Sequence, residues 1–283
     1  MNAVPTQAEL ADAMLEFVRP IPASANLEWV KERNFLYFFE AERLLKMREA
    51  LLAAGFNADV QFRVLDFGYL HGLVPEFLHR FFPRTTFTVL DHPDSPNFTD
   101  CEYQRLIAAR TYLTLRPCDI ASVRDFPGTY DLIILGEIIE HLDPTTVAKA
   151  AADLRAKVNS SGCLLITTPN GGGIFNTVYT FLGKDAQVPP IPNPVHHYGH
   201  IHIWTMTLLR KTLEHFGWRE LGVWFTHGKE GQCFRDLNAA WGSLRHQVLM
   251  RLLWLAADLR PKWRGFTVST WRPAEKTAVA SVS

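Results

Sequence analysis

The chain has 283 residues, of which 47% are hydrophobic and 20% are charged, a composition typical of soluble globular proteins. At this length it can hold one large domain, or one α/β domain with an added cap. The 29 Lys and Arg residues balance the 29 Asp and Glu residues, which excludes a chain that binds nucleic acid through its overall charge.

The four cysteines are far apart in the sequence and form no C-x-x-C pair. Their spacing disfavours a zinc knuckle and favours a reducing, cytoplasmic compartment. The N-terminus lacks the basic and apolar runs of a signal peptide, and no stretch of about 20 apolar residues could span a bilayer.

Two segments with helical periodicity come first, residues 7–19 and 28–54, and Gly55 is placed to end the second. They predict an N-terminal helical cap over residues 1–56. This cap either covers a ligand or only packs against the sheet that follows.

Residues 63–72, with the sequence Arg-Val-Leu-Asp-Phe-Gly-Tyr-Leu-His-Gly, predict a buried strand and a glycine turn. The apolar periodicity of residues 73–82 predicts a helix directly after them. Strand, glycine turn and helix is the unit that opens nucleotide-binding α/β folds, because glycines allow the backbone to approach a ligand.

Four further strands follow, and acidic residues stand after the first two of them. Residues 85–90 predict a second strand ending at Asp91, where a carboxylate can accept hydrogen bonds from ribose hydroxyls. Residues 112–115 predict a third strand leading to Asp119, which either meets a ligand or caps a helix. Residues 131–135 and 163–168 predict buried parallel strands, separated by a helix over 144–158 and a turn at 159–162.

Alternating strands and helices from 63 to 168 imply a doubly wound parallel sheet, in which ligands bind beyond the carboxyl ends of the strands. Beyond residue 170 we expect a short helix over 174–182 and a proline-rich lid over 183–199. A helix ending near His215 and strands over 218–226 and 266–271 complete the chain. The core would then comprise 57–230 and 262–275, with a helical insertion over 231–261.

The ordered motifs DxGxxxG, the acid after strand two, YDLIILGEIIEHL and GCLLITTPN resemble those of class I S-adenosylmethionine (SAM) dependent methyltransferases. The middle glycine of the usual first motif is replaced by Leu70. The resemblance implies a Rossmann-like, mostly parallel seven-stranded sheet whose last strand is antiparallel. It also implies a SAM site formed by Asp66, Gly68, Gly72, Asp91, Asp119 and Gly136.

The segment Glu137-Ile-Ile-Glu140-His141 spaces three ligand-type side chains at i, i+3 and i+4, which would share one face of a helical turn. Two carboxylates and an imidazole could hold Mg²⁺ or Mn²⁺. Alternatively, these groups line the acceptor pocket without a metal.

The same segment, with the later pattern from His200 to Trp204-Thr205, resembles the small-RNA 3′-terminal 2′-O-methyltransferases. Ubiquinone-biosynthesis and sugar O-methyltransferases show a similar pattern. The resemblance implies a metal site formed by Glu137, Glu140, His141 and His200, with Glu137, His141 and His200 as the catalytic candidates. One of the histidines, or a metal that lowers the pKa of a hydroxyl, would remove the acceptor proton.

We therefore expect a SAM-dependent O-methyltransferase that acts on a sugar or another small hydroxylated metabolite. RNA 3′-terminal 2′-O-methylation and a non-catalytic binding module are the alternatives. The apolar segment 244–259, surrounded by arginines, is interpreted as a core helix, a homodimer surface or a helix at a membrane surface.

Overall fold

A computed structural model of the chain describes residues 4–21, 28–181, 199–227 and 244–275. The predicted lid over 183–199 lies outside these ranges except for its last residue. Among the described residues, none of the helices is long and apolar enough to cross a membrane.

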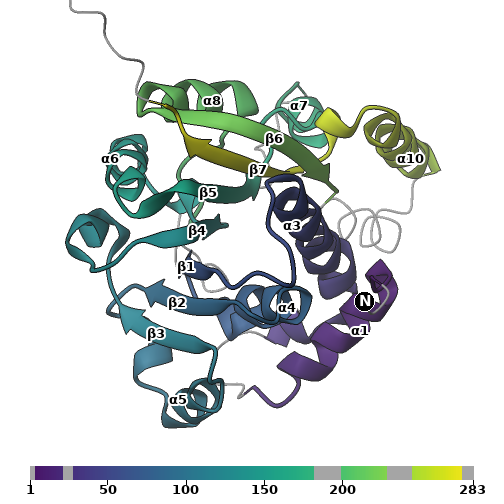
Figure 1. The fold of residues 1–283 in the computed structure, drawn as a ribbon. Helices are drawn as coiled ribbons and strands as arrows, with labels where there is room; N and C mark the ends of the chain where they lie inside the picture. Colours follow the sequence, from purple (N-terminus) through teal and green to yellow (C-terminus); the bar gives the residue numbers. More distant parts are fainter. Residues whose placement is uncertain (1–3, 22–27, 182–198, 228–243, 276–283) are drawn as a thin grey trace, which may run out of the picture.

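A seven-stranded sheet forms the centre of the fold, in the order β3-β2-β1-β4-β5-β7-β6 (Figure 1). The last strand, β7, runs antiparallel to both of its neighbours, and the other paired strands are parallel. The predicted Rossmann-like fold is thereby confirmed. The strands are β1 (Arg63–Phe67), β2 (Thr86–Asp91), β3 (Leu113–Pro117), β4 (Tyr130–Gly136), β5 (Val158–Pro169), β6 (Trp218–Thr226) and β7 (Phe266–Pro273).

Helices cover both faces of the sheet and bury one hydrophobic cluster on each side (Figure 1). On one face lie α1 (Gln7–Val18), α3 (Glu42–Ala53), α4 (Leu73–Phe81) and α5 (Cys101–Ala108); on the other lie α6 (Pro144–Arg155) and α8 (Met206–His215). Helices α7 (Ile174–Phe181) and α10 (Leu244–Leu259) contact each other near the β6–β7 end of the sheet.

Short helical turns join these elements, and several of them lie at the strand ends where a ligand is expected. They are η2 (Glu28–Lys31), α2 (Arg33–Phe35), η3 (Leu36–Ala41), η4 (Leu70–Gly72), η5 (Pro96–Phe98), η6 (Ile120–Asp125), η7 (Ile139–His141) and η8 (Pro261–Trp263).

The second N-terminal helix is less regular than its periodicity predicts. The segment 28–54 is divided into a 3₁₀ turn, a short α-turn, the π-helix η3 and α3. A π-turn holds an additional residue and rotates the side chains that follow it. Glu40 within this turn and Arg43 just after it face the sheet and are only 1% and 3% exposed.

The predicted turn at 159–162 is wrong, because β5 continues through these residues as a bulged strand. Tyr130 pairs with Val158 and Leu132 pairs with Cys163, so β5 holds three more residues than β4 between these pairs. The Asn159 side chain donates a 2.6 Å hydrogen bond to Asp131 on β4 and secures the bulge.

Candidate functional site

The glycine turn after β1 follows a different path from the one that the motif suggests. Its left-handed residues are Gly68, His71 and Gly72, with φ of 80°, 60° and 72°. Leu70 belongs to the 3₁₀ turn η4 and is not among the residues with positive φ. The turn therefore does not need glycine at position 70, and the substitution there is compatible with the backbone.

Gly72 is required by close packing as well as by its backbone. A Cβ atom at this position would lie 2.6 Å from Oη of Tyr69, whose side chain is buried over the turn. Burial raises the pKa of Tyr69 to about 12, so its hydroxyl stays neutral. The buried ring thus fixes the shape of the loop that leads into α4.

Asp91 at the end of β2 is held rigidly by the loop that follows it. Its Oδ2 accepts hydrogen bonds from the Ser95 hydroxyl at 3.1 Å and from the Asn97 side chain at 2.6 Å. Asp119, after β3, caps η6 by accepting from the Ala121 backbone at 2.9 Å. Both carboxylates lie at the predicted edge of the sheet, and Asp119 is half-exposed there.

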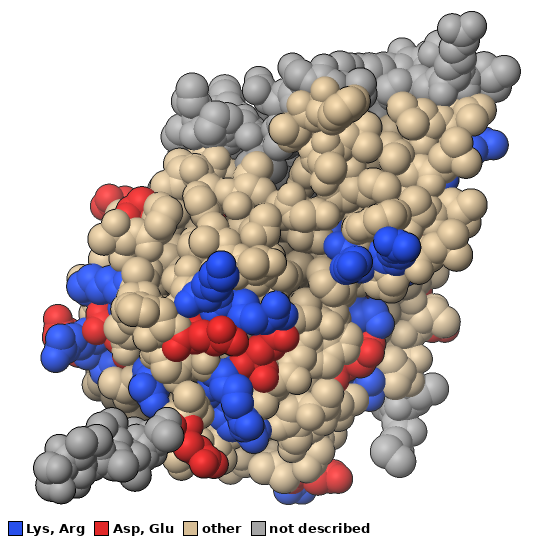
Figure 2. Space-filling model, turned by 90° about the horizontal axis from the view of Figure 1, so that it is seen from above, with Lys and Arg blue, Asp and Glu red and all other residues tan. Residues whose placement is uncertain are grey.

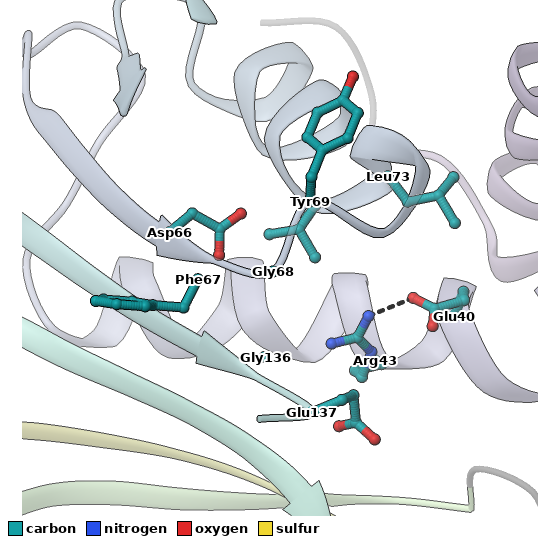
Figure 3. Close-up of a pocket in the computed structure, with 10 residues that line it drawn as sticks. Glu40, Arg43, Asp66, Phe67, Gly68, Tyr69, Leu73, Gly136 and Glu137 are labelled. Atoms are coloured by element: carbon teal, nitrogen blue, oxygen red, sulfur yellow. Dashed lines mark hydrogen bonds and ion pairs between the residues drawn. The ribbon is translucent and has the colours of Figure 1, made fainter. Parts of the chain in front are cut away.

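A pocket opens between α3, the glycine turn and the end of β4 (Figure 3). The space between its lining atoms is about 330 Å³, and this figure includes open solvent. Asp66 and Gly68 from β1 and its turn line it, together with Gly136 from β4. Three of the predicted cofactor residues therefore share one pocket.

Asp66 is buried, and burial raises the pKa of its carboxyl well above the ordinary value, although the Arg43 guanidinium opposes this shift. Its Oδ2 has no hydrogen-bond partner within the described residues. A buried acceptor without a partner is costly unless a ligand or water meets it. Asp66 is therefore suited to receive a donor from a bound ligand.

Two charged residues of this pocket, Glu40 and Arg43, were not predicted from the sequence, where their segment has the periodicity of an ordinary amphipathic helix. Nη2 of Arg43 donates to Glu40 at 2.5 Å, and Nη1 donates to Thr167 at 3.0 Å. The Thr167 hydroxyl in turn donates to Glu137 at 2.8 Å. Burial opposes the charge on Arg43, but the neighbouring Glu40 and Glu137 carboxylates outweigh it and raise its pKa.

Figure 3 shows Arg43 between Glu40 and Glu137, close to the tip of β1. Nε of Arg43 and Oε1 of Glu40 lack hydrogen-bond partners among the described residues. The pocket thus offers one donor and two acceptors at its wall.

Two adjacent threonines of β5 hold the two glutamates of the E-x-x-E-H segment apart. Successive strand residues point to opposite faces of a sheet. Thr167 contacts Glu137 on the α3 face, whereas the Thr168 hydroxyl donates to Glu140 at 3.1 Å on the other. Glu137 has a φ of 59° and precedes η7, so the expected helical i, i+3, i+4 arrangement is wrong.

The other three predicted metal ligands do converge. One ligand-type atom each from Glu140, His141 and His200 lies within 4.8 Å of the other two. The imidazoles of His141 and His200 meet edge to face with centroids 4.6 Å apart. Glu137 is not part of this group.

The chain around His200 is fixed to η7 by its backbone. The Glu140 carbonyl accepts from the amides of Ile201 and His202, at 2.9 and 3.2 Å. The buried Trp204 indole donates to the Ile139 carbonyl at 3.1 Å. These contacts bring two segments 60 residues apart into one site, as the sequence pattern implied.

The sheet order, the glycine turn and the acids at the strand ends are accompanied by a direct sequence match. A family model described as a methyltransferase domain matches residues 36–221. The chain belongs to this methyltransferase family. Its predicted class, the class I SAM-dependent methyltransferases, is confirmed, and the matched range includes Glu40, Arg43 and the whole pocket.

Solved methyltransferases share the fold of this enzyme at low sequence identity. Magnesium protoporphyrin IX methyltransferase from Synechocystis PCC 6803 with bound S-adenosylhomocysteine (SAH) is 12% identical, with a TM-score of 0.56 over 93% of this chain and 99% of the other. Coclaurine N-methyltransferase bound to N-methylheliamine and SAH is 13% identical, with a TM-score of 0.54 over 95% and 90%.

Mitomycin 7-O-methyltransferase is 12% identical, with a TM-score of 0.51 over 96% of this chain and 74% of the other. A comparison with curated protein sequences gives no significant match. The family match identifies the chain as a methyltransferase, and these neighbours, which are named for N- and O-methylation, leave the acceptor open.

Proposed function

We propose that this methyltransferase transfers the methyl group of SAM to a hydroxyl of a sugar or another small hydroxylated metabolite. The observation that carries the proposal is the convergence of Glu140, His141 and His200. Glu140 and His141 follow β4, the strand whose end also lines the Asp66 pocket. An acceptor hydroxyl placed there would lie beside the cofactor.

The pocket residues fit the polar ends of SAM. The Arg43 guanidinium suits the carboxylate of the methionine moiety, and Asp66, Glu40 and Glu137 suit its ammonium group. Asp91 would accept from the ribose hydroxyls, and Asp119 is placed for the adenine side. Bound SAM would supply the methyl group on a sulfonium sulfur, which takes the electron pair of the broken C–S bond as the acceptor oxygen forms its new bond.

The acceptor hydroxyl must lose its proton during this transfer. His141 and His200 are the side chains that could take it, since an imidazole titrates close to neutral pH. The carbonyl of Gly199 lies 3.3 Å from Nδ1 of His141 and favours the tautomer with a proton on Nδ1. This tautomer leaves Nε2 of His141 as the basic nitrogen.

A divalent metal ion at Glu140, His141 and His200 is the second part of the proposal. Three ligand atoms at about 2.0–2.2 Å from one ion cannot all be more than about 3.8 Å apart, so this group, whose atoms lie within 4.8 Å of one another, would contract around an ion. Two imidazoles and one carboxylate suit Mn²⁺ better than Mg²⁺, which prefers oxygen ligands. Such an ion would lower the pKa of a bound hydroxyl.

The proposed function is tested by incubating the enzyme with isotopically labelled SAM and a panel of sugars and small polyols, and by detecting methylated products by mass spectrometry. Calorimetry with SAH on the same preparation measures the cofactor site independently. Tight SAH binding without methylation of any hydroxyl acceptor would refute the proposed acceptor class alone. Absence of SAH binding by the folded protein would refute the assignment of the pocket.

The metal is tested with Glu140→Gln and its matched variant Glu137→Gln. We expect Mn²⁺ to restore activity lost in EDTA. Glu140→Gln should lose turnover while retaining SAH affinity, and Glu137→Gln should weaken SAH binding. Full activity of the wild type in EDTA would eliminate the metal and leave the histidines as the base.

RNA 3′-terminal 2′-O-methylation remains the second candidate. A terminal ribose, like a sugar, offers two neighbouring hydroxyls to Glu140, His141 and His200. On the face seen in Figure 2, basic and acidic residues are interleaved and form no continuous basic surface. The zero net charge likewise disfavours a long RNA footprint. Methylation of a short RNA in preference to every small acceptor would favour this candidate.

A non-catalytic binding module was the third alternative, and Leu70 was its main support. The backbone at position 70 does not need glycine, and the match to the methyltransferase domain supports an enzyme instead. A cytoplasmic location and the division into cap, core and insertion stay predictions.

A further inference from the structure

Helix α10 carries a stripe of exposed apolar side chains on the side facing away from the protein. Met250 and Ala257 are 3% and 0% exposed and seat the helix on the protein. The apolar side chains of the stripe recur at i, i+4, i+7 and i+11, a spacing that aligns them along one helix face. They are Val248, Leu252, Leu255 and Leu259, exposed by 48%, 58%, 54% and 75%.

The charges around this stripe are almost all positive. Arg251 within the helix and Arg260 and Lys262 just after it are exposed. Asp258 is the only carboxylate in residues 244–264. It is already engaged, because its Oδ1 lies 2.8 Å from Nε2 of His227 and 3.1 Å from Nη2 of Arg264.

Polar contacts fix α10 to the rest of the enzyme in this orientation. The His227 ring stacks on Trp254 of α10 with centroids 3.8 Å apart. Glu42 of α3 accepts from the His227 amide at 3.1 Å and from Arg264 at 3.4 Å. Helix α10 lies at the periphery of the molecule (Figure 1) and is tied through His227 to α3.

We propose that the stripe on α10 docks the enzyme onto the surface of an anionic phospholipid bilayer. Leucine side chains would enter the boundary between head groups and acyl chains, and Arg251, Arg260 and Lys262 would contact the lipid phosphates. Trp263 is half-buried, and Cζ of Arg260 lies over its ring, 4.8 Å from the ring centroid. Tryptophan is a residue type favoured at this boundary.

A second copy of the chain fits this face less well. A two-fold pairing of α10 would bring two sets of the same basic side chains together. The single carboxylate of the region, Asp258, is engaged within its own chain. An anionic surface supplies the complementary charge that a second copy lacks.

The proposal is tested by co-sedimentation with phosphatidylcholine vesicles, with and without phosphatidylglycerol. We expect binding to the anionic vesicles and little binding to the neutral ones. Leu252→Gln combined with Leu255→Gln should weaken binding by at least about tenfold. Arg251→Gln should weaken it by about fivefold, the contribution of one cation near an anionic surface.

Val60→Gln is the matched control, because Val60 is 52% exposed and lies in the loop between α3 and β1. It should bind vesicles as the wild type does. Failure of the wild type to bind anionic vesicles would overturn the proposal, and so would equal binding to neutral ones. If the wild type forms a dimer and does not bind vesicles, and the variant with both leucine substitutions is monomeric, the face belongs to a second copy instead. None of these results depends on the methyl acceptor.

Discussion

The buried imidazole of His71 makes the stability of the enzyme depend on pH in a way that can be calculated. His71 is 3% exposed within the glycine turn. Burial, with a smaller effect from Lys31, lowers its pKa from 6.5 to about 3. The folded enzyme therefore holds a neutral imidazole, whereas the unfolded chain takes up a proton below about pH 6.5.

The sign and the size of the effect follow from these two pKa values. Because the folded pKa is depressed, the stabilisation is complete above about pH 6.5 and is lost as the pH falls toward about 3. Each decrease of one pH unit in this window lowers the free energy of unfolding by about 1.4 kcal/mol. Lowering the pH from about 7 to about 5 should therefore reduce the free energy of unfolding by about 2 kcal/mol. This is a large share of the roughly 5–15 kcal/mol by which a folded domain is typically stable.

Urea unfolding of the wild type and His71→Asn at both pH values isolates this contribution. Asparagine does not titrate and tolerates the left-handed backbone that His71 adopts at φ 60°. His227, whose pKa is also lowered by burial, is present in both proteins and cancels in the comparison. We expect the wild type to lose about 2 kcal/mol more than the variant. Equal losses by the two proteins would refute the reasoning.

Three further predictions concern the site. Gly72→Ala should lower the free energy of unfolding by about 1–2 kcal/mol and weaken SAH binding. The added methyl group would lie 2.6 Å from Oη of Tyr69, on a residue with a left-handed backbone. An unchanged urea midpoint would contradict this. Thr167→Val should weaken SAH binding about tenfold, as measured by calorimetry, whereas Thr168→Val should spare SAH and reduce Mn²⁺-dependent turnover. Identical effects of the two valine variants would disprove the separation of the two glutamates. Asp91→Asn should raise the Kd for SAH by about tenfold, and an unchanged Kd would remove the proposed ribose contact.

Sequence patterns predicted the fold well, because β4 and β5 carry uninterrupted apolar runs, over 132–135 and 163–166, that have few alternative explanations. The acids Asp66, Asp91 and Asp119 were found because they lie in a predicted strand, at its end or shortly after it. Arg43 was not predicted as a site residue because a charged residue in an amphipathic helix normally faces water. Only the π-turn and the packing against β5 bury it.

Glu137 illustrates a second limit of sequence reasoning. The spacing of the E-x-x-E-H segment assumes helical backbone throughout, but a single left-handed residue at its start sends the first glutamate to the other face of the sheet. A dihedral angle of this kind leaves no trace in a hydrophobic pattern. The approach of His200 to His141 depends on tertiary contacts, so only the resemblance between families could indicate it.

The bulge in β5 decides where the chain can change in length. Pairing with β4 is regular from Leu132 and Cys163 onward, whereas residues 159–162 already stand out of register. An insertion at 159–162 would enlarge an existing irregularity. One residue added between Cys163 and Thr167 would exchange the faces of both threonines, turning Thr167 away from Arg43 and Thr168 away from Glu140. Length variation among relatives of this enzyme is therefore expected at 159–162, and the five residues from 163 to 167 should keep a constant count.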